Sequence, residues 1–154
     1  MHYNRLSVFV SLITILCLSS RMSNAQFKPD DITGIWQTPE HLSEIQIYKN
    51  GDKYYGKIIW EKEPVDSSGK PKKDSKNPNP SLRNRLIHGL VIIQNLRFNG
   101  KEWEGGKIYD PESGNDYRII AELSDNNTLK VRGYIGISLI GRSSVWKRKT
   151  LCQN

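Results

Sequence analysis

The residues best suited to bind an anion are two arginines at the end of a proline-rich stretch. Arg83 and Arg85 lie two positions apart and would point to the same face if this segment is extended. A planar guanidinium fits a carboxylate or phosphate through paired hydrogen bonds, so both residues are candidates for ligand binding near the mouth of a site. The alternative is that they pair with internal acids, such as Asp74 or Asp110, and anchor the loop.

Asp74 and Asn77 precede these arginines and complete the candidate set. Asp and Asn next to proline, as in Asn77-Pro78-Asn79-Pro80, form turns through bonds between side chain and backbone. The segment belongs to a long irregular stretch, Glu61 to Pro80, and loops of this length are often functional. Its lysines alternate with acids, which favours a solvated loop over a uniformly basic binding surface.

Catalytic chemistry has little support in the sequence. His41 and His88 lie in different segments, and neither a nucleophile elbow nor a paired-histidine metal motif occurs. Glu102, Glu104 and Asp110 could form an acid/base pair, but the sequence does not show their separation. We therefore predict no catalytic residues, no metal site and no cofactor.

The first 25 residues have the pattern of a secretory signal peptide. Arg5 gives a basic start, Leu6 to Leu18 is apolar, and Ser23-Asn24-Ala25 supplies the small residues that a signal peptidase reads. We predict cleavage before Gln26 and export to the periplasm or the extracellular space. The apolar run is shorter than the roughly 20 residues that span a bilayer, so we expect no stable membrane span after cleavage.

Removal of 25 of the 154 residues leaves 129, which suits one domain over residues 26–150 with a tail at 151–154. Because Arg5 and Arg21 leave with the signal and no acid does, the net charge falls from +7 to +5. No basic cluster with interleaved aromatic residues remains, so a nucleic-acid partner is not expected. The oligomeric state stays open.

Cysteine content excludes an internal disulfide in the mature chain. Cys17 is removed with the signal, and Cys152 is the third residue from the C-terminal end. We interpret Cys152 as a tail residue without a structural role, and the alternative is a bridge between two molecules.

From Ile32 onward, apolar residues recur with a period close to two, and turn signals separate the runs every eight to twelve residues, which is typical of an all-β domain. Asn50-Gly51-Asp52 and Asn99-Gly100 predict two hairpin turns. A short helix would fit only Pro39 to Ser43 or Ser81 to Arg85. The expected strands are Gly34 to Thr38, Glu44 to Lys49, Tyr54 to Trp60, Gly89 to Phe98, Glu102 to Tyr109, Tyr117 to Leu123, Thr128 to Tyr134 and Leu139 to Arg148.

Eight strands with mostly tight connections favour an antiparallel up-and-down arrangement. A sandwich is the alternative, but closure into a barrel removes exposed strand edges. An eight-stranded barrel has room for side chains or for one small ligand. We therefore predict a single eight-stranded barrel.

Motifs along the chain carry a resemblance to a known family. They are Tyr55-Gly56-Lys57-Ile58, Asp74-x-x-Asn77-Pro78, Leu82-Arg83-x-Arg85, Trp103-x-Gly105-Gly106-x-Ile108-Tyr109-Asp110-Pro111 and Arg132-Gly133-Tyr134-Ile135-Gly136. Together they resemble the secreted bacterial proteins grouped as domain of unknown function 2147, over about Ile32 to Arg148. The resemblance implies a lipocalin-like barrel and an exported protein, without a reaction or a ligand.

The two ends of this region also resemble the terminal signature of lipocalin and calycin barrels. The resemblance implies that Gly34 lets the chain pass close beneath the barrel and that Trp36 plugs its closed end. A basic residue of the last strand then lies across the indole as a cation–π contact. We expect Arg148 in this position, with Arg142 as the reserve.

Two functions fit these predictions. The first is a barrel that binds a small apolar or amphipathic ligand, with Arg83 or Arg85 near its mouth for a carboxylate. The second is a packed barrel of the cell envelope that contacts a protein or glycan through its surface, including the lysine-rich loop. An enzyme is the least supported class.

Overall fold

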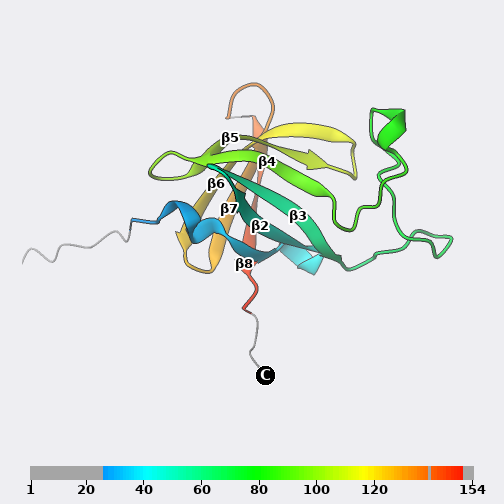
Figure 1. Ribbon diagram of the computed structural model, residues 1–154, viewed down its shortest axis with the longest axis horizontal. Helices are drawn as coiled ribbons and strands as arrows, with labels where there is room; N and C mark the ends of the chain where they lie inside the picture. The colour runs from blue at the N-terminus through cyan, green and yellow to red at the C-terminus, as the bar shows by residue number, and fades with distance from the viewer. Residues whose placement is uncertain (1–25, 139, 151–154) are drawn as a thin grey trace, which may run out of the picture.

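The structure is a computed structural model that describes residues 26–138 and 140–150. The predicted signal segment, residues 1–25, and Cys152 lie outside the described residues. Eight antiparallel strands form one closed barrel in which each strand pairs with the next and β8 pairs with β1 (Figure 1). The strands are β1 (Gly34–Gln37), β2 (Ser43–Asn50), β3 (Lys53–Glu61), β4 (Val91–Phe98), β5 (Trp103–Asp110), β6 (Asn115–Asp125), β7 (Thr128–Tyr134) and β8 (Gly141–Arg148).

The barrel confirms the predicted fold and excludes the sandwich. Each predicted strand is present, and its ends differ from the prediction by two residues at most. Short 3₁₀ helices, η2 (Pro39–His41) and η3 (Pro80–Leu82), lie in or beside the two places where a helix was expected. A third, η1 (Pro29–Ile32), was not predicted, because four residues before the first strand carry no periodic signal.

One end of the barrel is closed by η1 and by the aromatic side chains beneath it. Trp36 is fully buried, and its indole Nε1 donates to the carbonyl oxygen of Ile32 over 2.8 Å. The guanidinium carbon of Arg148 lies 4.2 Å from the centre of the Trp36 rings. The Arg148 guanidinium also donates to the carbonyl oxygens of Thr33 and Asp31, over 2.6 Å each. The last strand thus fastens the entering chain across this end.

Gly34 makes room for this contact. Its φ of +135° is unfavourable for residues with a side chain, and a Cβ there would lie 2.6 Å from Nη1 of Arg148. The structure therefore places Gly34, Trp36 and Arg148 in the arrangement that the lipocalin resemblance implies. Arg142 lies at the other end of β8 and does not take part.

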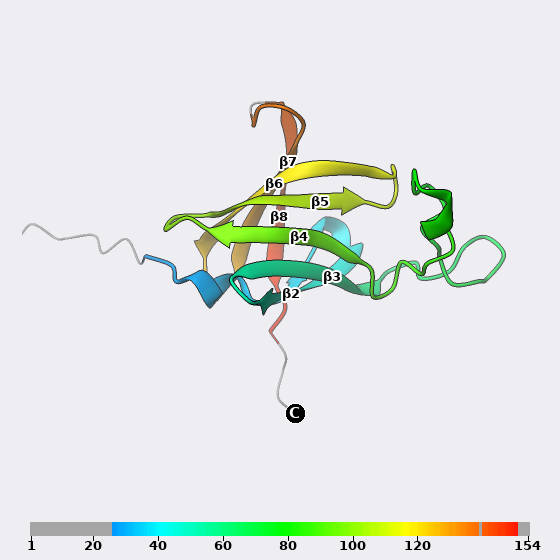
Figure 2. The same cartoon turned by 45° about the horizontal axis from the view of Figure 1, so that its top comes forward.

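The opposite end carries four connections, because alternate strands of an up-and-down barrel end on the same side. These are η2, the long β3–β4 loop that contains η3, the β5–β6 turn and the β7–β8 loop. Figure 2 shows the β3–β4 loop and η3 projecting beyond the strands at this end. The candidate site lies among these connections.

Candidate functional site

A cavity of about 640 Å³ opens at this end of the barrel. Its volume lies within the range of about 300 to 1,000 Å³ that is usual for small-molecule sites. The apolar side chains of its floor and walls come from strands on several sides and from the β3–β4 loop. They are Ile45, Ile58, Ile87, Ile92, Ile108, Val131 and Trp146. This lining suits the apolar part of a ligand.

Gly133 on β7 contributes to the width of the cavity. A Cβ at this position would lie 3.6 Å from Cβ of Tyr117 and 3.7 Å from Cγ2 of Ile108, which is ordinary van der Waals contact. All three residues line the cavity. The absence of a side chain at Gly133 therefore leaves space that a larger residue would fill.

The rim of the cavity carries two cations, Lys62 and Arg142, whose side chains have no partner among the residues that the structure describes. Arg142 on β8 lies opposite Gly133 in the β7–β8 pairing. Its guanidinium makes neither a hydrogen bond nor an ion pair with any residue that the structure describes. Since arginine stays protonated at any ordinary pH, it places a fixed positive charge beside the apolar floor.

Acidic side chains lie elsewhere on the rim. Glu61 ends β3, and burial raises the pKa of its carboxyl, with a further rise from Glu112, while His88 and Lys72 oppose the shift. Asp110 ends β5 and accepts hydrogen bonds from Glu112 N and Ser113 Oγ within its own turn. The rim thus carries both cations and carboxyl groups, the latter at the ends of β3 and β5.

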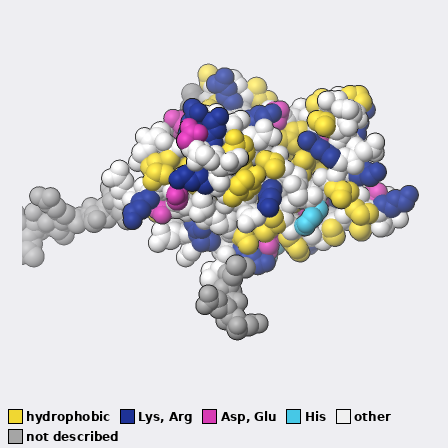
Figure 3. All heavy atoms as spheres, viewed as in Figure 1, with side chains coloured by type: hydrophobic (Ala, Val, Ile, Leu, Met, Phe, Trp, Pro, Cys, Tyr) yellow, Lys and Arg dark blue, Asp and Glu magenta, His cyan; other side chains and the backbone are white. Residues whose placement is uncertain are grey.

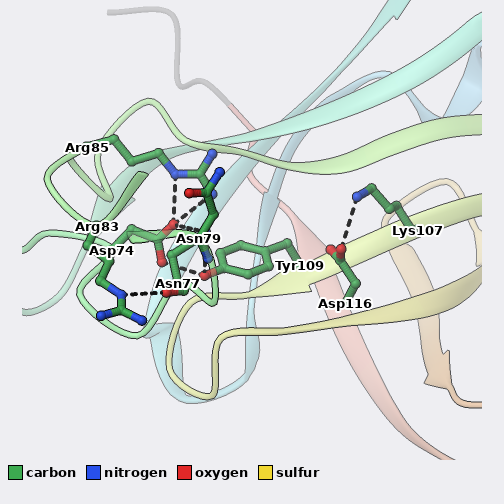
Figure 4. Close-up of polar contacts among 8 residues, drawn as sticks. All are labelled: Asp74, Asn77, Asn79, Arg83, Arg85, Lys107, Tyr109 and Asp116. Carbon is green, nitrogen blue, oxygen red and sulfur yellow. Dashed lines mark hydrogen bonds and ion pairs between the residues drawn. The ribbon is translucent and has the colours of Figure 1, made fainter. Parts of the chain in front are cut away.

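A polar cluster that we name the Asp74 network lies beside the cavity (Figure 4). Its Asp74, Asn77 and Tyr109 side chains are buried. The Asp74 carboxylate accepts hydrogen bonds from the Tyr109 hydroxyl and from Asn77 Nδ2. Arg85 donates to the same carboxylate from Nε and Nη2, over 2.7 Å each. The Arg85 guanidinium also lies 5.4 Å from the centre of the Tyr109 ring. Every member therefore has a partner, as buried polar groups require.

Burial and the bond to Asp74 raise the pKa of Tyr109, with Asn77 and the charge of Arg85 opposing. The Tyr109 hydroxyl stays protonated and donates to the carboxylate. The network joins strand β5 to the β3–β4 loop, which also carries Ile87 and Lys72 into the cavity lining. It therefore positions one wall of the cavity.

The structure corrects the prediction that Arg83 and Arg85 form a pair on one extended face. The chain turns through η3 at this point, and the two side chains separate. Arg83 donates from Nε to the carbonyl oxygen of Asn77 over 2.7 Å, while Arg85 binds Asp74. The sequence left two roles open for these arginines, ligand binding and anchoring of the loop. In the structure both side chains anchor the loop. Asp110 is not a partner of either arginine.

The arginine at the mouth is instead Arg142, which sequence reasoning kept only as the reserve for Trp36. A signal was available in the alternation of the last strand. Residues two apart share a face, and stepping back from Arg148 and Trp146 by twos reaches Ser144 and Arg142. This pattern places Arg142 on the inner face at the end of the strand farther from Trp36.

Of the carboxylates considered for acid/base chemistry, Glu102 precedes β5, and Glu104 and Asp110 lie on it. Glu104 accepts a hydrogen bond from Asn99 near the closed end, whereas Asp110 lies six residues further on, about 20 Å away at the rise of a strand. These two do not form a pair. Within the described residues, no group of three or more His, Cys, Asp or Glu side chains could hold a metal ion. No helix among these residues is long and apolar enough to cross a membrane.

A closed eight-stranded up-and-down barrel, plugged at one end and open onto an apolar cavity at the other, defines the lipocalin-like class. The chain belongs to the family described as "uncharacterized protein conserved in bacteria" (DUF2147), which matches residues 34–148. Among solved structures it is similar to protein HP1028 of Helicobacter pylori, described as a member of the lipocalin family. The identity is 30%, the match covers 77% of this chain and 82% of the other, and the TM-score is 0.68. The comparison with curated proteins found no match.

Proposed function

We propose that this protein binds a small amphipathic molecule in the barrel cavity and acts as a binding protein and not as an enzyme. The observation that carries the proposal is a cavity of about 640 Å³ with an apolar floor and, at its rim, Arg142, which has no partner within residues 26–138 and 140–150. Ligand sites in proteins combine mostly apolar walls with a few polar groups that orient the ligand. The lipocalin classification of the H. pylori relative supports the same class of function.

Arg142 favours an anionic head group at its side of the mouth. An apolar chain would lie against Val131, Ile108 and Trp146, and a carboxylate would meet the guanidinium of Arg142. A carboxylate accepts two parallel hydrogen bonds from arginine, which orients the ligand with its head at the mouth. Arg142 thereby takes the role that sequence reasoning gave to Arg83 or Arg85.

Binding of parinaric acid, followed by its fluorescence, tests this proposal, with the methyl ester as a neutral probe of equal length. Arg142→Gln is expected to weaken binding of the acid by about ten- to hundredfold, the usual effect of losing a bond to a charged group. The same variant should bind the methyl ester nearly as tightly as the unmodified protein does. Gly133→Phe is expected to abolish binding of both probes, because the ring occupies the cavity. Arg97→Gln, an exposed arginine on β4, is the matched control.

The free energy of unfolding of each variant is measured in urea alongside the binding assay, so that a loss of affinity can be distinguished from a loss of folded structure. Absence of binding of both probes to the unmodified protein would contradict the proposal. Equal binding of both probes by Gly133→Phe and by the unmodified protein would place the site outside the barrel.

We also propose that the protein is exported after removal of residues 1–25. The basic start, the apolar run and the small residues before Gln26 support this. Expression in a bacterial host should yield a periplasmic or secreted chain whose N-terminal residue is Gln26, as determined by mass spectrometry of the intact chain. A full-length chain that starts at Met1 in the cytoplasmic fraction would overturn this proposal. Ala25→Arg should block cleavage, with Ser20→Arg as a control outside the cleavage motif.

The alternative, a barrel that acts through its lysine-rich loop, has less support. A surface groove of about 550 Å³ is lined by Lys70, Lys72, Lys73, Lys76 and Arg83. Most of these cations have partners within the protein. Lys72 pairs with Glu63, Lys73 donates to Asn84, and Lys76 donates to the carbonyl oxygen of Glu112. The open cavity therefore favours the ligand-binding function.

A further inference from the structure

Three isoleucines project from the β7–β8 loop into solvent. Ile135, Ile137 and Ile140 are 65%, 60% and 67% exposed. Isoleucine is among the residues most often buried, and a cluster of exposed apolar side chains marks an interaction site. Figure 3 shows hydrophobic side chains with Lys or Arg side chains among them at the top of the molecule, where Figure 1 places this loop. We name these three side chains the isoleucine tip.

The backbone holds the isoleucine tip in a defined conformation. Ile135 N donates to Ile140 O, and Ile140 N donates to Ile137 O, so the loop folds back on itself. Arg132 donates from Nε to the carbonyl oxygen of Ser138 over 2.6 Å. Because these bonds turn the backbone inward, the isoleucine side chains point outward.

The isoleucine tip adjoins the mouth of the barrel. A groove of about 560 Å³ is lined by Ile135 and Ile140, and it shares four residues with the barrel cavity. These are Asp110, Tyr117, Gly133 and Arg142. A partner that covers the isoleucine tip therefore also faces the opening of the cavity.

The charged groups around the isoleucine tip favour an anionic partner. Arg118, which lies opposite Tyr134 in the β6–β7 pairing, is exposed, and its side chain has no partner among the described residues. Arg142 is equally unengaged. The neighbouring acids are engaged, since Asp116 pairs with Lys107 over 3.0 Å and Asp110 is bonded within its own turn. Two cations therefore stay available beside the apolar side chains.

We propose that the isoleucine tip docks the barrel on a lipid surface that contains anionic head groups, with the mouth of the cavity facing the membrane. Apolar side chains that enter the head-group region, together with arginines at the surface, are the combination that binds such membranes. A stable protein interface uses roughly 20 to 30 residues on each side, whereas this protruding tip offers three apolar side chains. The surface thus fits a bilayer better than a second protein. Docking does not depend on a bound ligand.

Vesicle flotation of the chain from Gln26 onward tests the proposal. This part holds all eight strands and the barrel core, so it contains the folded domain. Vesicles of phosphatidylcholine are compared with vesicles that also contain phosphatidylglycerol. The protein is expected to float with the anionic vesicles and to be released by added salt, because salt screens the attraction. The triple variant Ile135→Ser, Ile137→Ser, Ile140→Ser should weaken partitioning by about a hundredfold, since three apolar side chains no longer enter the lipid.

A control replaces an exposed apolar side chain on a strand, away from the connections at the mouth, as Val145→Ser on β8. It should bind vesicles like the unmodified protein. Arg118→Gln should weaken binding to the vesicles that contain phosphatidylglycerol and leave binding to the phosphatidylcholine vesicles unchanged. Val131→Phe, which narrows the barrel cavity at a residue outside the groove beside the isoleucine tip, should bind vesicles normally, so docking can succeed even if the proposed ligand function fails.

Absence of flotation, or flotation that the triple variant does not reduce, would overturn the proposal. Analytical ultracentrifugation tests the remaining alternative, which is self-association through the isoleucine tip. If the unmodified protein forms a dimer and the triple variant is a monomer, the isoleucine tip contacts a second copy of the chain. This result would also overturn the lipid assignment.

Discussion

Trp36→Ala is expected to reduce the free energy of unfolding by about 3 to 5 kcal/mol, the usual loss when a large buried aromatic side chain is removed. Trp36 is fully buried and bonded to the Ile32 carbonyl oxygen. The substitution empties the closed end of the barrel and removes the ring on which Arg148 lies. Because Arg148 also holds Thr33 and Asp31, the cost includes a looser entering chain. Urea unfolding, followed by circular dichroism, measures the loss.

Trp60→Ala is the matched control for this experiment. Trp60 lies on β3 and is 42% exposed, so its replacement should cost less than about 1 kcal/mol, in the range of surface substitutions. A comparable loss for the two tryptophans would contradict the interpretation of Trp36 as the plug of the barrel.

Asp74→Ala is expected to cost about 2 to 4 kcal/mol. The carboxylate is fully buried, and its removal leaves the Arg85 guanidinium, the Tyr109 hydroxyl and the Asn77 amide without their common acceptor. Breaking a fully buried ion pair costs about 3 to 5 kcal/mol, but the Arg85 side chain is partly exposed and recovers some hydration. We therefore expect a value somewhat below that range, measured by urea unfolding.

The loss of stability caused by Asp74→Ala should be concentrated in the β3–β4 loop. Trypsin is expected to cleave the variant after Lys72 or Lys76 of this loop much faster than the unmodified protein, since the loop is no longer fastened to β5. Binding of parinaric acid should weaken as well, because Ile87 of this loop lines the cavity. Asp116→Ala is the control, since its pair with Lys107 is exposed and worth less than about 1 kcal/mol. Unchanged stability and unchanged proteolysis of Asp74→Ala would show that the network is dispensable.

The fold was largely predictable because its signals are local. Alternation with period two and the turns at Asn50-Gly51 and Asn99-Gly100 depend on neighbouring residues alone, and they predicted the strands to within two residues. The assignment of Trp36 and Arg148 came from a resemblance to known barrels, since nothing in the local sequence relates residues so far apart.

The candidate site was only partly predictable. Asp74, Asn77, Arg83 and Arg85 were recognised as one set, but whether they bind a ligand or each other depends on distances that the sequence does not contain. The alternation of the last strand could have placed Arg142 on the inner face, but not beside a cavity. The importance of Arg142 comes from what surrounds it, namely an apolar cavity and the absence of a partner among the described residues.

The sequence by itself determined that this chain forms an all-β domain of eight strands in up-and-down order, because strand period and turn chemistry are properties of short segments. Only the tertiary structure decided that β1 pairs with β8, that Arg83 and Arg85 hold the β3–β4 loop, and that Arg142 at the open mouth has no partner among the described residues. The physical reason is that hydrogen bonds and ion pairs act over a few ångströms. Which charges neutralise one another is therefore settled when the closed barrel brings distant segments into contact.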